Sequence, residues 1–120
     1  MEIFRIEEFA KMKVPTASTF FRQEIVASSQ KAKNLGGIFV LVPAGSQVPY
    51  HFHRKRESII IVVSGEATEI VEGKEFHIKA NDVLYIPIEE KHTVANRTDR
   101  DFRYIEFFTC PDISDFIEVK

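Results

Sequence analysis

Residues 45–65 read GSQVPYHFHRKRESIIIVVSG and contain two strand-like patterns. In an extended strand, successive side chains point to opposite faces, so His51 and His53 lie on the same face. Their Cα atoms would be ~6.6 Å apart, and two imidazoles at that spacing can converge on one metal ion. The apolar run at 59–63 is short enough for a strand and is followed by Gly65. The segment therefore predicts two strands, the first of which carries a pair of potential metal ligands.

The rest of the chain is rich in the same residue types. It contains 14 Ile, 11 Val and 11 Phe but only 3 Leu, and β-branched and aromatic residues favour strands. Short apolar runs recur between Gly, Pro and Asn, as is typical of a sandwich or barrel. The predicted strands cover residues 19–28, 37–42, 49–54, 57–64, 66–71, 74–78, 83–87, 92–96 and 102–109. So many strands in so short a chain predict an all-β closed barrel or two-layer roll.

The length of 120 residues suits one domain covering residues 1–120. We expect a hairpin turn at Glu72-Gly73, because glycine tolerates the positive φ of such turns. A short helical turn is predicted at residues 7–12. The amphipathic segment at 111–117 is predicted to pack on the body of the domain or on a second subunit.

Composition and charge exclude several classes of protein. Hydrophobic residues make up 44% and charged residues 28%, the balance of a soluble globular domain. A net charge of −2 gives no basic field for nucleic acid, and no apolar stretch reaches the ~18 residues of a membrane helix. Cys110 is the single cysteine, so no disulfide forms within the chain. The charged N-terminal residues do not resemble a secretory signal, and we expect a cytoplasmic protein.

A third imidazole is needed to build a metal site from His51 and His53, and the sequence offers two. His92 follows a predicted strand that ends at Pro87, where a side chain can turn into a barrel mouth. His77 lies in the middle of a strand and is interpreted as a surface or wall residue. The His-x-His pair alone is equally compatible with two ordinary histidines on a strand.

The histidines belong to two longer motifs. The first spans residues 45–65 and consists of Gly45, His51, His53, Glu57 and Gly65. The second spans residues 81–96; it begins with Asn81-Asp82 before an apolar run and Pro87, and it ends with His92 and Asn96. Fifteen residues separate the two motifs. In this order and at this spacing, the two motifs resemble those of the cupin superfamily. The resemblance implies a cupin-type jelly-roll barrel that binds one divalent metal through His51, His53, Glu57 and His92.

The sequence departs from the family pattern at three positions. Asn81 stands where a glycine is usual, and asparagine tolerates positive φ. Glu89 replaces a glycine after Pro87 and brings a carboxylate near the predicted barrel mouth. Seven residues instead of six separate Glu57 from Gly65, so counting back from Gly65 places Ser58 at the glutamate position. A one-residue slip reverses which side chain enters the barrel. Glu57 is the predicted ligand; without a bulge, Ser58 would face inward and the site would have three imidazoles.

The ligand types suit Fe, Mn, Ni, Cu or Zn without selecting one of them. Tyr85, Glu89 and Glu106 are the candidate catalytic residues, because each could move protons near the metal. The run Arg54-Lys55-Arg56 is compatible with attraction of anionic substrates and also with a solvated loop.

The resemblance indicates a metal-dependent enzyme that acts on a small oxygen-rich substrate such as a sugar, keto acid or enediol. Isomerase, lyase and dioxygenase chemistries all fit it. One alternative is a non-enzymatic metal-binding, ligand-binding or sensory barrel, and another is a metal-free barrel in which the histidines act as acid–base groups. Cupin relatives are commonly dimers, and the apolar edge strands would benefit from being covered, so we expect a homodimer.

Overall fold

The computed structural model of this chain describes residues 1–11, 20–25, 31–112 and 114–120. One short helix, α1 (Ile6–Ala10), precedes the strands. The strands are β1 (Phe21–Glu24), β2 (Leu35–Val42), β3 (His51–Phe52), β4 (Ser58–Ser64), β5 (Glu66–Val71), β6 (Lys74–Lys79), β7 (Val83–Ile86), β8 (His92–Ala95), β9 (Phe102–Thr109) and β10 (Ile117–Glu118). The all-β prediction is confirmed. The predicted helical turn forms at Ile6–Ala10, and Met12 lies outside the described residues.

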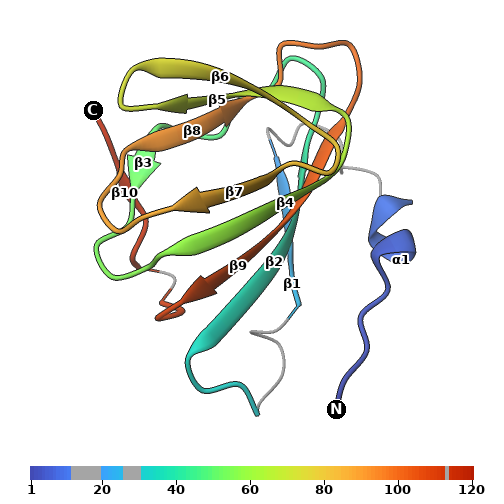
Figure 1. Ribbon diagram of the computed structural model, residues 1–120, viewed down its shortest axis with the longest axis vertical. Helices are drawn as coiled ribbons and strands as arrows, with labels where there is room; N and C mark the ends of the chain where they lie inside the picture. Colours follow the sequence, from blue (N-terminus) through green and yellow to red (C-terminus); the bar gives the residue numbers. More distant parts are fainter. Residues whose placement is uncertain (12–19, 26–30, 113) are drawn as a thin grey trace.

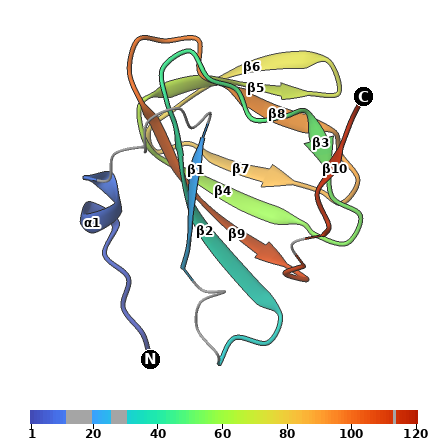
Figure 2. The same cartoon turned by 180° about the vertical axis from the view of Figure 1, so that it is seen from behind.

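The strands form two antiparallel sheets that face each other as a jelly-roll (Figures 1 and 2). We call the first sheet A; its strand order is β1-β2-β9-β4-β7. We call the second sheet B; its strand order is β10-β3-β8-β5-β6. Inward-facing residues from both sheets form the main core, which includes the fully buried Phe102, Val42 and Val62.

Local sequence explains two of the tight connections. The β5–β6 hairpin turns at Glu72 and Gly73, which have φ values of 48° and 82°, as a turn with two positive φ angles requires. Gly65 joins β4 to β5 at a φ of 85°, and a Cβ atom there would lie 2.5 Å from the carbonyl oxygen of Asp101. A side chain at position 65 would therefore force β4 and the start of β9 apart.

The two ends of the chain pack on different parts of the roll. Phe9 of α1 stacks on Phe39 at the outer face of sheet A, with ring centroids 4.7 Å apart. At the other end, β10 pairs with β3 and extends sheet B (Figure 2). This confirms that the C-terminal segment packs on the body of the domain. In the described part of the chain, no helix has the length and apolar character needed to cross a lipid bilayer.

Candidate metal centre

Three histidines of sheet B converge inside the roll. His51 on β3 lies directly opposite His92 on β8 in the antiparallel ladder, so both side chains point to the same face. His53 follows two residues after His51 and returns to that face. One nitrogen from each ring lies within 4.8 Å of the others. The predicted convergence of these three imidazoles is observed.

Each imidazole is oriented by a backbone carbonyl. The Nδ1 atom of His51 donates to the Pro49 oxygen at 2.6 Å, and that of His92 donates to the Glu90 oxygen at 2.9 Å. The Nδ1 atom of His53 donates to the backbone carbonyl oxygen of Asp115. A carbonyl can only accept a hydrogen bond, so each Nδ1 carries a proton, and in the neutral ring Nε2 then keeps its lone pair. The three rings are thus held in the tautomer that binds metal through Nε2.

Burial favours the neutral form of His51 and His53. The three histidines are only 4–6% exposed. Burial, together with the nearby His92, lowers the pKa of His51 to about 3. Burial also lowers the pKa of His53. Because a metal binds the neutral imidazole, these shifts favour metal binding at neutral pH.

The C-terminal segment covers the histidines. The ring of Phe116 stacks on His51 with a centroid distance of 4.0 Å and an interplanar angle of 15°. The carboxylate of Asp115 accepts hydrogen bonds from the backbone N–H groups of Arg54 and Lys55 at 2.7 and 3.0 Å. The end of the chain is therefore fastened to the segment that carries two of the three imidazoles.

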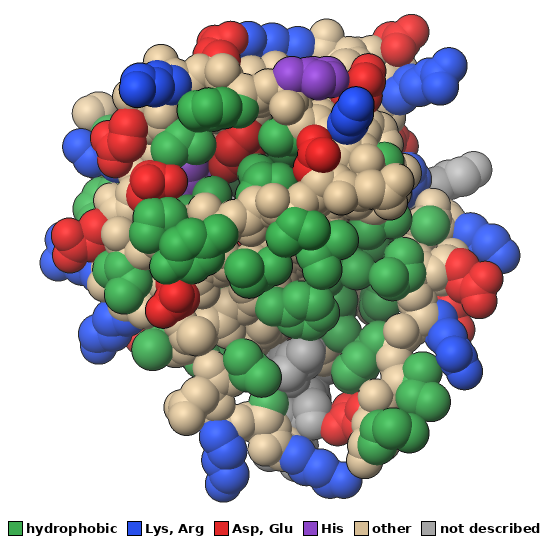
Figure 3. Space-filling view, viewed as in Figure 1, with side chains coloured by type: hydrophobic (Ala, Val, Ile, Leu, Met, Phe, Trp, Pro, Cys, Tyr) green, Lys and Arg blue, Asp and Glu red, His purple; other side chains and the backbone are tan. Residues whose placement is uncertain are grey.

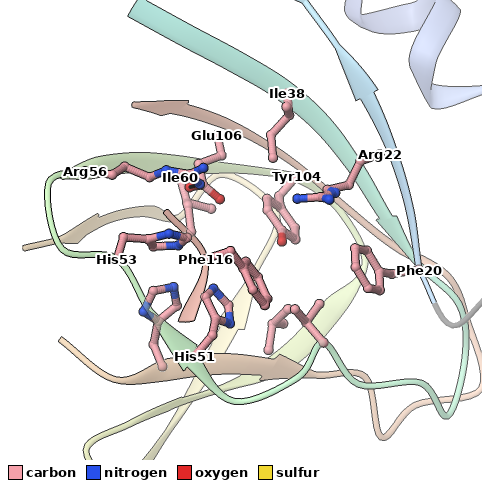
Figure 4. Close-up of a pocket in the computed structure, with 13 residues that line it drawn as sticks. Phe20, Arg22, Ile38, His51, His53, Arg56, Ile60, Tyr104, Glu106 and Phe116 are labelled. Atoms are coloured by element: carbon pink, nitrogen blue, oxygen red, sulfur yellow. Dashed lines mark hydrogen bonds and ion pairs between the residues drawn. The ribbon is translucent and has the colours of Figure 1, made fainter. Parts of the chain in front are cut away.

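Sheet A and the β3–β4 loop supply charged and hydroxyl groups to the same pocket (Figure 4). The Oε2 atom of Glu106 on β9 accepts a hydrogen bond from the Ser58 hydroxyl at 2.8 Å. The same oxygen forms an ion pair with Nη1 of Arg56 at 3.3 Å. The hydroxyl-bearing Tyr104 lies on the same face of β9 as Glu106. Burial raises the pKa of Tyr104 well above its usual range, and the Glu106 charge adds to this shift. Of the predicted catalytic residues, Glu106 is thus brought to the histidines.

The structure does not bring Glu57 to the histidines. Its exposed carboxylate accepts a hydrogen bond from the Tyr85 hydroxyl at 3.0 Å, whereas Ser58 is 3% exposed and faces inward. A bulge is present in β4, but it lies between Val62 and Ser64, and the ladder from Ser58 to Val62 is regular. Glu57, the predicted ligand, therefore points away from the histidines, and Ser58 takes the inward position, as the sequence predicts for a strand without a bulge there.

Two other predicted site residues also lie away from the histidines. Tyr85 is 56% exposed on the outer face of sheet A, near the exposed apolar residues Ile59 and Val83. These residues belong to the apolar surface over β4 and β7 in Figure 3. Glu89 is exposed at the turn before β8, where its backbone N–H donates to the carbonyl oxygen of His53 at 2.8 Å. Its contact with the site is made by the backbone.

Several pocket residues carried no recognisable motif. Phe116 and Asp115 belong to the segment predicted to pack back, but no pattern linked them to the histidines. Arg22 on β1 lines the pocket and had no signal at all in the sequence. Arg56 could be suspected from the basic run, of which Arg54 and Lys55 are exposed and Arg56 alone is buried.

The donor set fits a divalent transition metal. Three neutral imidazoles with oriented Nε2 atoms match the ligand preferences of zinc, iron, nickel and copper. With no carboxylate in the group, three protein ligands leave coordination positions for water or a small molecule. His51, His53 and His92 can therefore hold a metal.

Comparisons with known proteins agree with this architecture. The oxalate-binding protein of Thermotoga maritima is 31% identical over 64 residues, which cover 53% of each chain. A double-stranded β-helix protein from Klebsiella pneumoniae has a TM-score of 0.80 and 20% identity, covering 100% of this chain and 99% of that one. The polyketide cyclase RemF from Streptomyces resistomycificus has a TM-score of 0.76 and 18% identity, covering 91% of this chain and 77% of that one.

At sequence identities of 18–20%, the similarities to the two solved structures establish the fold alone. The chain spans about half the length, or less, of the curated relatives that it matches. The family model described as Cupin domain matches residues 37–108, which include all three converging histidines. The chain therefore belongs to the cupin family.

Proposed function

We propose that this protein binds one divalent transition metal at His51, His53 and His92 and uses the site to act on a small oxygen-rich molecule. The observation that carries the proposal is the shared tautomer of the three rings. Each Nδ1 donates to a backbone carbonyl, so three Nε2 lone pairs are directed away from the backbone and into the pocket.

The chain supplies proton-handling groups opposite the imidazoles. A bound divalent metal would supply Lewis acidity toward ligand oxygen atoms. Glu106 is buried, and its oxygen is shared by Ser58 and Arg56, so its carboxylate is held in one orientation. Tyr104 keeps its proton because burial raises the pKa of its hydroxyl. Glu106 is thus the proposed general base and Tyr104 a proposed hydrogen-bond donor.

Enzymatic relatives support a catalytic role. The polyketide cyclase RemF has the same fold, and at 18% identity this similarity does not extend to the substrate of the present protein. Isomerase, lyase and dioxygenase reactions all remain compatible with the site, because each can begin with two substrate oxygens near a metal and a base. The homodimer and the cytoplasmic location stay predictions.

The metal is tested by mass spectrometry of purified, untagged protein. We expect about one equivalent per chain in the wild type, and loss of the metal in the His51→Ala/His92→Ala double variant. His77→Ala is the matched control, because His77 lies on sheet B but its side chain is 63% exposed. Wild-type protein that contains no metal and takes up no added Fe, Mn, Ni, Cu or Zn would contradict the proposal.

Phe116 favours a second candidate function. Its ring lies flat on His51 and restricts access to the imidazoles, as would suit a protein that binds a metal or ligand without turning it over. The two functions are separated by incubating the metal-loaded protein with 2-oxo acids, 2-hydroxy acids and enediols, and by following the substrates by NMR. Turnover that is lost in Glu106→Gln supports the enzyme. Full metal occupancy without turnover of any compound supports the binding function.

A further inference from the structure

The pocket beside the histidines carries an excess of positive charge. Apart from the three imidazoles and Tyr104, its ionisable lining residues are Arg22, Arg56 and Glu106. Two guanidinium charges against one carboxylate give a net charge of +1 before any metal binds. A divalent ion would raise this to +3. A ligand that enters such a low-dielectric pocket is favoured strongly when it is an anion.

Arg56 is the best-placed anion-binding group. Arg56 is only 7% exposed, and its Nε atom is buried without a hydrogen-bond partner among the described residues. Nη1 makes its ion-pair contact with Glu106 at a rather long 3.3 Å. The guanidinium lies over the Phe108 ring at 3.9 Å from the centroid, which fixes its plane. A buried arginine with an unused N–H group is a costly feature that an incoming acceptor would satisfy.

A second guanidinium reaches the pocket from another strand. Figure 4 shows Arg22 beside the Tyr104 ring, with Arg56 on the other side of Glu106. Both arginine charges act on the Tyr104 hydroxyl and oppose the rise of its pKa. The positive groups thus lie near the sheet A wall, while the metal-binding nitrogens belong to sheet B.

The space between these walls is small. The cavity has a volume of about 30 Å³, and one water molecule needs roughly 10–15 Å³. Phe116, Ile60 and Val94 are among the apolar residues of the lining. A ligand of a few atoms fits this space better than a sugar phosphate does.

We infer that the ligand of this site is a small 2-oxo- or 2-hydroxycarboxylate, whose carboxylate is held by Arg56 with support from Arg22. Its neighbouring oxygen would then face the imidazole side. This inference rests on the proposed metal site but concerns residues that are not metal ligands. A carboxylate matches the planar guanidinium, and an amide of the same shape lacks the negative charge.

The test compares lactate with its neutral isostere lactamide. Cobalt(II)-loaded protein is titrated with each compound, and with inorganic phosphate, while the visible absorption bands of the metal are followed. We expect lactate to bind at least about 10-fold more tightly than lactamide, because its hydrogen bonds to arginine are charge-assisted. Equal binding of lactate and lactamide, or tighter binding of phosphate than of lactate, would overturn the inference.

Variants of the basic run locate the effect. Arg56→Gln should weaken lactate binding about 10- to 100-fold, with unchanged cobalt stoichiometry, and Arg56→Lys should recover part of the loss. Arg54→Gln is the matched control, because it removes an exposed charge two residues away. Thermal unfolding verifies that each variant is folded. Unchanged lactate affinity in folded Arg56→Gln and Arg56→Lys would contradict the role of Arg56.

Failure of the metal site would be distinguishable from failure of this inference. If cobalt does not bind to the wild type, the proposed function fails, and the same titrations are read by calorimetry on the metal-free protein. An Arg56-dependent preference for lactate over lactamide would still support the anion site there. Absence of that preference would overturn the inference as well.

Discussion

The two sheets face the same pocket with opposite chemistry. Sheet B contributes three imidazoles that are each oriented by a backbone carbonyl, and burial favours the neutral form of His51 and His53. Sheet A and the loop before β4 contribute permanent charges and hydroxyl groups. Each sheet also buries one glutamate: Glu106 on sheet A is partnered by Arg56 and Ser58, whereas Oε1 of Glu69 on sheet B has no hydrogen-bond partner in the part of the chain that the structure describes.

This difference separates two tasks within one pocket. Neutral imidazoles hold a metal best where no permanent charge competes with it. Charged groups on the other wall can select the ligand without entering the coordination sphere. Changes on sheet B should therefore alter metal affinity, and changes on sheet A should alter stability and ligand choice while the metal site remains.

The largest effect on stability is expected from Glu106→Ala. The variant leaves the Arg56 charge buried without its carboxylate, and breaking a buried ion pair in this way costs about 3–5 kcal/mol of unfolding free energy. The pair has side chains that are 8% exposed, so solvent screening is weak. Denaturant unfolding measures the loss.

A double variant provides the control for that prediction. Arg56→Met/Glu106→Leu removes both charges and should restore most of the stability, because an apolar pair of similar volume replaces a buried ion pair at little cost. A loss below about 1 kcal/mol in Glu106→Ala would mean that the pair behaves like an exposed one. The charged character of the sheet A wall would then contribute little to folding.

A smaller effect is expected on the sheet B side from Asp115→Ala. The carboxylate of Asp115 holds the backbone of Arg54 and Lys55, and its carbonyl orients His53. The variant keeps this carbonyl but removes the carboxylate that holds it in place, so the orientation of His53 should loosen and metal binding should weaken about 10-fold, without loss of stoichiometry. Competition with a chromophoric chelator measures this affinity.

Asp112→Ala is the matched control, because the Asp112 carboxylate bonds only to Ser114 among the contacts described. It should leave metal affinity unchanged. If Asp115→Ala also leaves it unchanged, the C-terminal segment covers the histidines without orienting them, and the division of tasks between the sheets would not extend to β10.

The sequence allowed the fold and the histidine group to be predicted because both depend on local alternation. The period of two places His51 and His53 on one face, and Glu72-Gly73 has the backbone freedom that the hairpin needs. His92 was added to the pair of His51 and His53 through the resemblance of the second motif to the cupin superfamily, and the structure pairs it with His51. Family membership then supplied the expectation of a jelly-roll, which the two sheets confirm.

The remaining residues of the pocket could not be predicted from the sequence, and the reasons are physical. The run Ile59–Val63 is apolar at every position, so it does not reveal which residue of Glu57 and Ser58 faces inward. Phe116 reaches the site through pairing of β10 with β3, which is a long-range contact. Arg22 arrives through pairing of β1 with β2, and nothing in its local sequence distinguishes it from a solvated arginine.

The smallest effect is expected from Glu69→Gln, which tests whether the buried glutamate of sheet B is uncharged while that of sheet A is charged. Burial raises the pKa of Glu69 well above its usual range, and the Glu106 and Glu90 charges raise it further. The folded protein therefore retains a proton that the unfolded chain releases above about pH 4.5. Because the folded state binds more protons, wild-type stability should fall as the pH rises from that value through the folded-state pKa.

Glutamine has the same shape and does not titrate, so Glu69→Gln should remove this part of the pH dependence. We expect the variant to be more stable than the wild type near neutral pH, with a difference that shrinks toward pH 4. Glu24→Gln, at an exposed position of β1, is the control and should show no such trend. Denaturant unfolding across this pH range measures the difference. A constant difference would mean that Glu69 is ionised in the folded protein, and sheet B would then carry a buried charge as sheet A does.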